Sequence, residues 1–150
     1  NAVMASNGFS LAGTGEGLLA YASMKIHLRI PANSVSNDIR IFGKGLIKSR
    51  ISTQKAVVYV TATCLETGAS LTNTVNIPVS NDEQNIVFLT GTLFGANVAG
   101  NTVQVVFERE AGQGDDDAAR SALSISNIQI ANDTKSVSGS KKSNEFSYRL

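Results

Sequence analysis

Apolar and polar residues alternate along most of the chain after residue 20. In the segment 24–30, every second residue is apolar, and the residues between them are lysine, histidine and arginine. A period of two places these two sets on opposite faces of a β-strand. The same pattern predicts further strands at 38–47, 55–65, 70–79, 86–93, 102–108 and 123–130.

The segment 55–65 alternates most clearly. Its core-facing positions are predicted to be Ala56, Val58, Val60, Ala62 and Cys64. The short turn 66–68 contains glycine, so this strand and 70–79 are expected to form a hairpin. Only residues 115–122 suggest a helix, because aspartates precede alanines there, and a loop with one helical turn fits that segment equally well.

These elements predict an all-β fold, namely an antiparallel β-sandwich, jelly-roll-like, with seven to eight strands. The sandwich domain is expected to span residues 21–131. Residues 1–20 are expected to be a glycine-rich lead-in from an upstream stalk or domain, either flexible or folded as an irregular edge strand. Residues 132–150 form a polar tail that ends in a short alternating segment.

Composition narrows the class of protein. Of the 150 residues, 42% are hydrophobic and 17% charged, which is enough apolar content for a core and too little charge for a disordered chain. No apolar run reaches the roughly 18 residues of a membrane span, so no membrane insertion is expected. Serine, threonine and asparagine together number 41, which predicts outer faces rich in hydroxyl and amide groups.

The formal net charge of +1 gives no general attraction to nucleic acid, and no such partner is expected. The charge is unevenly spread, since residues 25–55 carry a local net charge of +6 and residues 66–117 one of −7. Two opposed regions could form complementary subunit contacts, or the basic one could meet an anionic glycan. A strand order that interleaves the two would instead give a mixed surface, which is the preferred interpretation.

No residue pattern indicates catalysis. His27, the single histidine, falls on the polar face of its strand between two basic residues, as an ordinary surface histidine would. Cys64, the single cysteine, falls on the inward face and is interpreted as a small core residue; it allows no internal disulfide. Glu108 and Glu110 lie in or just beyond one strand and would share its face, whereas glycoside hydrolysis needs two carboxylates on facing strands.

The most distinctive polar cluster consists of Asp115, Asp116 and Asp117, directly after Gly112-Gln113-Gly114. Clustered carboxylates on a loop can hold calcium through their oxygens. The alternation of an EF-hand loop and its closing glutamate are absent. A solvated acidic loop is therefore the preferred interpretation, with calcium as the alternative and no other cofactor expected.

Two segments carry a resemblance to a known group of proteins. Residues 103–117 run through a strand ending near Glu108-Arg109 into a Gly/Asp loop, and residues 122–130 form a strand containing Ile125-Ser126-Asn127-Ile128. This arrangement resembles the closing strands of small β-sandwich domains in bacteriophage tail fibre and tailspike proteins. The strand 24–30, followed by Pro31, is similar to an early strand of the same domains.

The resemblance implies a jelly-roll-like virion domain that forms a homotrimer about a fibre axis, lies outside the host cell and recognises a bacterial surface polysaccharide or receptor. Candidate glycan-binding residues in this chain are Tyr21, Tyr59 and Arg29. No catalytic residue is expected within this segment, although an upstream catalytic domain is compatible with it.

Two alternatives remain open. The chain could be a carbohydrate-binding module of a secreted polysaccharide-degrading enzyme, in which Tyr21, Tyr59 or Tyr148 stacks on sugar rings and the aspartate cluster holds calcium. A purely structural domain that stabilises a trimer fits the same residues as well as a receptor-binding domain does.

Overall fold

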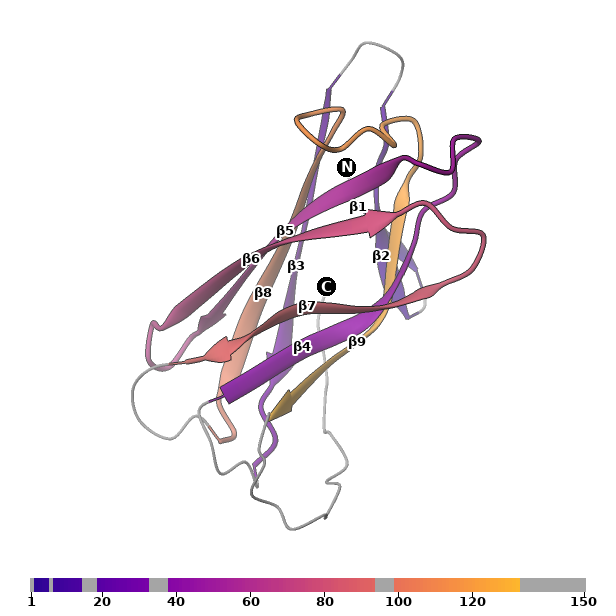
Figure 1. Ribbon diagram of the computed structural model, residues 1–150. Coiled ribbons are helices and arrows are strands. Elements are labelled where there is room, and N and C mark those ends of the chain that lie inside the picture. The colour runs from indigo at the N-terminus through magenta and orange to yellow at the C-terminus, as the bar shows by residue number, and fades with distance from the viewer. Residues whose placement is uncertain (1, 6, 15–18, 33–37, 94–98, 133–150) are drawn as a thin grey trace.

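The computed structural model describes residues 2–5, 7–14, 19–32, 38–93 and 99–132, and these residues form nine strands (Figure 1). The strands are β1 (Ala2–Ala5), β2 (Gly8–Leu11), β3 (Ala20–Arg29), β4 (Asp38–Leu46), β5 (Lys55–Cys64), β6 (Ser70–Pro78), β7 (Gln84–Thr92), β8 (Thr102–Ala111) and β9 (Leu123–Asn132). Over these residues the chain has no helix that is long and apolar enough to cross a membrane.

The strands form two antiparallel sheets, with the orders β1-β2-β9-β4-β7 and β3-β8-β5-β6. The predicted all-β sandwich is therefore confirmed, and the predicted strands correspond to β3–β9. The two strands beyond the expected seven are β1 and β2, which are four residues each and too short for their alternation to be recognised. They lie within residues 1–20, where β2 pairs with β9 and adds an edge to the first sheet.

The predicted hairpin of β5 and β6 is also confirmed, with Tyr59 opposite Thr74 near its middle. Residues 112–122 form a loop of turns between β8 and β9, so residues 115–122, where a helix was considered, are not helical. The expected polar tail and Tyr148 lie outside the described residues.

The core lies between the two sheets and is built from the inward positions of each strand. All five inward residues predicted for β5 are buried, Cys64 included. Phe107 of β8 lies at the centre, with its ring 5.3 Å from that of Phe9 in β2 and 5.2 Å from that of Phe88 in β7. These aromatic contacts join strands of both sheets in one core.

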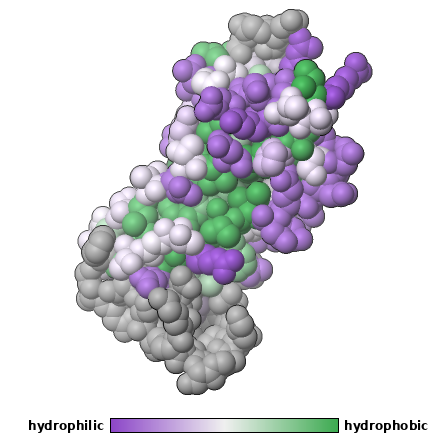
Figure 2. All heavy atoms as spheres, viewed as in Figure 1, coloured by the Kyte–Doolittle hydropathy of each residue, from purple (hydrophilic) through white to green (hydrophobic). Residues whose placement is uncertain are grey.

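One side of the sandwich is bordered by an edge strand from each sheet. Strands β6 and β7 are the edge strands of their sheets and lie next to each other, joined by a hydrogen bond from Asn73 Nδ2 to the carbonyl oxygen of Phe88 at 2.8 Å. Figure 2 shows a strip of apolar surface across the middle of this side. The partly buried side chains of Leu71, Val75 and Val79 contribute to the core along this edge.

Candidate functional site

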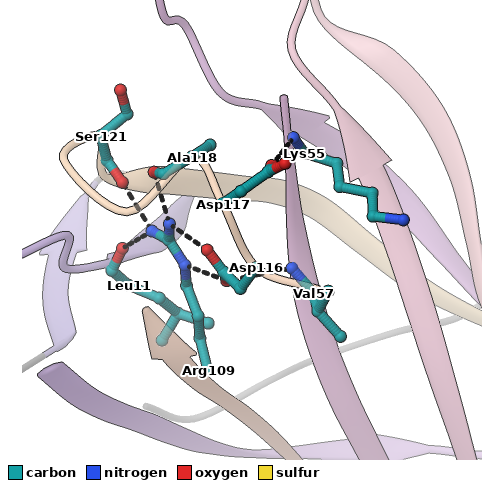
Figure 3. A network of polar contacts seen from close by, with 8 residues as sticks. All are labelled: Leu11, Lys55, Val57, Arg109, Asp116, Asp117, Ala118 and Ser121. Atoms are coloured by element: carbon teal, nitrogen blue, oxygen red, sulfur yellow. Dashed lines mark hydrogen bonds and ion pairs between the residues drawn. The ribbon is translucent and has the colours of Figure 1, made fainter. Parts of the chain in front are cut away.

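The loop that carries the three aspartates is fastened to the core by a buried arginine (Figure 3). Arg109 occupies an inward position of β8, and both it and Asp116 are buried. Its Nε donates to Asp116 Oδ2 at 2.8 Å, and its Nη2 donates to Asp116 Oδ1 at 3.1 Å. This is a bidentate ion pair, the geometry in which a guanidinium and a carboxylate bind most strongly.

The remaining N–H groups of Arg109 donate to backbone carbonyl oxygens. Nη1 reaches Leu11 at 3.2 Å and Ser121 at 2.6 Å, and Nη2 also reaches Ala118 at 2.9 Å. A guanidinium has five N–H donors, and all five have acceptors here. A buried charge is costly unless its partners are complete, so this network makes the burial of Arg109 tolerable.

The other two aspartates have different surroundings. Asp117 Oδ1 accepts a hydrogen bond from the backbone N–H of Lys55 at 2.8 Å, while Asp115 is exposed. Asp116 Oδ2 also accepts one from the backbone N–H of Val57 at 3.0 Å. Within the described ranges, no group of three or more acidic, histidine or cysteine side chains converges as a metal site would require. The cluster fastens the β8–β9 loop to β5.

The burial of Arg109 was not predicted from the sequence. The alternation does place Arg109 on the inward face of its strand, because Arg109 follows Val103, Val105 and Phe107 at the same period-two spacing. A charged residue at an inward position indicates a buried partner, and Asp116 is only seven residues away.

Replacing Arg109 with methionine should lower the free energy of unfolding by about 3–5 kcal/mol, because Asp116 would stay buried without its cation. Urea unfolding followed by circular dichroism measures this change. Arg50→Met is the matched control, since Arg50 is exposed, and it should shift stability by less than about 0.5 kcal/mol.

Equal stabilities for the two variants would show that the network contributes nothing. If Arg109→Met does not fold, adding Asp116→Leu should restore folding, because replacing both partners of a buried pair with apolar residues removes the unpaired charge.

The second candidate region is the outer face of the sheet β3-β8-β5-β6. Tyr21 of β3 lies opposite Glu110 of β8, and Tyr59 of β5 lies opposite Glu108 on the other side of the same strand. Their side chains are 57% and 45% exposed. The Tyr21 hydroxyl donates to Glu108 Oε2 at 2.5 Å. The structure therefore brings two of the predicted glycan-binding residues together around one carboxylate.

The rest of this face is polar and rich in hydroxyl groups. Cross-strand register places Ser23, Glu108, Tyr59 and Thr74 in one row, which spans about 14 Å at the ordinary spacing of strands. Beside Tyr59 lies an open hollow of about 580 Å³. Its lining residues are Tyr59, Val60, Thr61, Thr72, Asn73 and Thr74.

The third predicted residue, Arg29, lies at the opposite end of β3. It is eight residues from Tyr21, or about 26 Å along an extended strand, and pairs with Thr102. Both residues are on the outer face, but one sugar ring cannot contact both. His27 is on this face too, opposite Gln104.

The residues considered for catalysis remain apart from one another. Cys64 is buried, and its Sγ accepts a hydrogen bond from Asn101 Nδ2 at 3.5 Å. The Glu66 carboxylate near it accepts from the backbone N–H of Thr102 at 3.0 Å. Glu108 and Glu110 occupy the same outward face of β8, as the alternation predicted.

The hydrogen bond to Glu108 raises the pKa of Tyr21 above the ordinary value of 10.0, since the carboxylate favours the protonated phenol; Ser23 opposes the shift. Because the pKa is raised on folding, the bond stabilises the fold below pH 10.0 and this contribution is lost as the pH rises through the raised value.

Titration of tyrosinate absorbance should therefore show that Tyr21 titrates above its ordinary pKa, with Tyr21→Phe identifying its signal. Glu108→Gln should lower this pKa towards 10.0, and Glu110→Gln should lower it less because Glu110 acts through its charge alone. An unchanged titration in Glu108→Gln would contradict the assigned hydrogen bond.

No protein-family model and no curated protein matches this sequence. Solved structures similar to it include the enzymatically active domain of tailspike protein 4 from bacteriophage CBA120, at a TM-score of 0.46 and 16% identity over 87% of this chain. This chain spans only 16% of the length of that tailspike domain.

A family 16 carbohydrate-binding module is also similar, at a TM-score of 0.43 and 16% identity, over 86% of this chain and 82% of the module. One phage tailspike domain and one carbohydrate-binding module are therefore among the solved structures similar to this chain.

Proposed function

We propose that this chain is a non-catalytic domain of a phage tail fibre or tailspike-type virion protein, which forms a homotrimer and attaches to a glycan on the host cell surface. The glycan-binding part of this proposal is supported by the side chains on the outer face of the sheet β3-β8-β5-β6. There, two exposed tyrosines flank Glu108 in a field of hydroxyl side chains.

The chemistry of this face suits a saccharide. A tyrosine ring offers a flat apolar surface to the C–H groups of a sugar ring, and its hydroxyl can exchange hydrogen bonds. The Glu108 carboxylate can accept from sugar hydroxyls, and the Tyr21 hydroxyl already holds it in place. Arg29, at the far end of β3, would contact only a saccharide that runs along the strand.

Trimer formation rests on the sequence resemblance and on the side of the sandwich that the two edge strands border. The unpaired edge strands β6 and β7 lie on one side, and the apolar strip between them is a surface that contact between copies would cover.

Binding should be tested on an array of bacterial surface polysaccharides, followed by calorimetric titration of the best ligand. Tyr59→Ala should weaken its binding by about 5- to 30-fold, as expected for the loss of a buried aromatic anchor, while Tyr59→Phe should retain most of the affinity. Met4→Ala is the control, since Met4 is 51% exposed and belongs to β1 of the other sheet.

If Tyr59→Ala and Met4→Ala bind equally well, the sheet face is not the glycan site. Binding to plant polysaccharides in place of bacterial ones would favour a carbohydrate-binding module of a secreted enzyme. Absence of any glycan binding in a stable trimer would favour the purely structural domain.

Light scattering on the chain should give a mass three times the 15.8 kDa of one copy. The measurement should be made over a range of concentrations, because weak association depends on concentration. A monomer at the highest concentration would contradict the proposed trimer.

A further inference from the structure

We infer that the cleft at the loop end of the sandwich binds the anionic group of an acidic saccharide. The cleft measures about 1270 Å³ and lies between the loop 47–54, which precedes β5, and the loop 112–122, which precedes β9. Both loops are at the top of Figure 1. This site is separate from the sheet face proposed above and does not rest on it, because neither Tyr21 nor Tyr59 lines it.

The charge of the lining is positive. Lys48, Arg50 and Arg120 line the cleft and are all exposed. Two carboxylates, those of Asp116 and Asp117, line it as well. Asp116 is neutralised by the bidentate pair with Arg109, which leaves Asp117 alone against three cationic side chains.

Two of these cations form no ion pair within the described part of the chain. Among the residues for which the structure gives positions, neither Lys48 nor Arg50 forms an ion pair with a carboxylate. A cleft whose lining carries a net positive charge concentrates anions. Charge-assisted hydrogen bonds to carboxylate or phosphate oxygens then hold them.

The walls of the cleft are fixed before any ligand binds. In the first loop, the Ser49 hydroxyl donates to Gln54 Oε1 at 2.7 Å and accepts from the backbone N–H of Ile51 at 3.2 Å. The second loop is held by the Arg109 network, and the Ser121 hydroxyl donates to the carbonyl oxygen of Lys48 and so joins the two loops. Preformed walls lower the entropy cost of binding.

The rim of the cleft favours a saccharide over a bare anion. Leu19 and Ile51 line it and are 58% and 54% exposed, so the rim includes two aliphatic side chains that a ligand can reach. The C–H face of a sugar ring can cover such side chains while its carboxylate meets the cations.

The test is calorimetric titration of the full chain at low salt with tetragalacturonate, its fully methyl-esterified form, and inorganic phosphate. Tetragalacturonate should bind, and its affinity should fall as salt is added. The esterified form, which has the same sugars without the charge, should not bind. The double variant Lys48→Gln with Arg50→Gln should weaken binding of tetragalacturonate by at least about fivefold.

The matched control is Arg40→Gln with Lys44→Gln, which removes the same charges from β4 and should bind like the unmodified chain. Unchanged binding in the Lys48/Arg50 variant, or equal binding of the esterified form, would overturn the inference. Phosphate binding as tight as that of tetragalacturonate would overturn the assignment to a saccharide.

Tyr59→Ala separates this site from the sheet face. It should leave tetragalacturonate binding unchanged if the saccharide lies in the cleft. A loss in Tyr59→Ala without a loss in the Lys48/Arg50 variant would place the acidic saccharide on the sheet face, supporting the proposed function and overturning this inference.

Discussion

Burial of the Arg109 guanidinium is tolerable only because the β8–β9 loop and the end of β2 provide an acceptor for each of its donors. The constraint acts in both directions. The arginine needs Asp116 and three backbone carbonyl groups, and an eleven-residue loop with little apolar content, 112–122, needs the arginine to hold one conformation. The ordered loop in turn forms one wall of the cationic cleft.

The two sheets contribute differently to the molecule. Their inner faces supply an apolar core around Phe107, while most side chains of the outer faces stay outside that core. On β3-β8-β5-β6, this arrangement allows serine, threonine, tyrosine and glutamate side chains to stand in register across four strands. A rigid sheet is a good platform for such groups, because its side chains are held at fixed spacings.

The fold brings the basic and the acidic segments of the sequence together at one place. Lys48 and Arg50 belong to the basic segment 25–55, and Asp116 and Asp117 belong to the acidic segment 66–117, yet all four line one cleft. The lining is cationic because Arg120 adds a third positive charge, and a buried arginine from within the acidic segment neutralises Asp116. A local charge count cannot show this cancellation.

The sequence by itself determined the strands β3–β9, the hairpin of β5 and β6 and the inward positions of β5, because period-two alternation depends on each residue and its immediate neighbours. The same alternation places Tyr59 on the outward face of its strand. Only the tertiary structure decided that Tyr21 and Tyr59 flank one carboxylate, that Arg29 lies far from both, and that β1 and β2 extend a sheet. It also decided that Asp116 of the aspartate cluster is buried and holds the loop in place. Asp116 contacts Val57 across 59 residues of sequence, and Arg109 contacts Leu11 across 98. Such contacts follow from the order of strands in the sheets, which no local pattern of residues encodes.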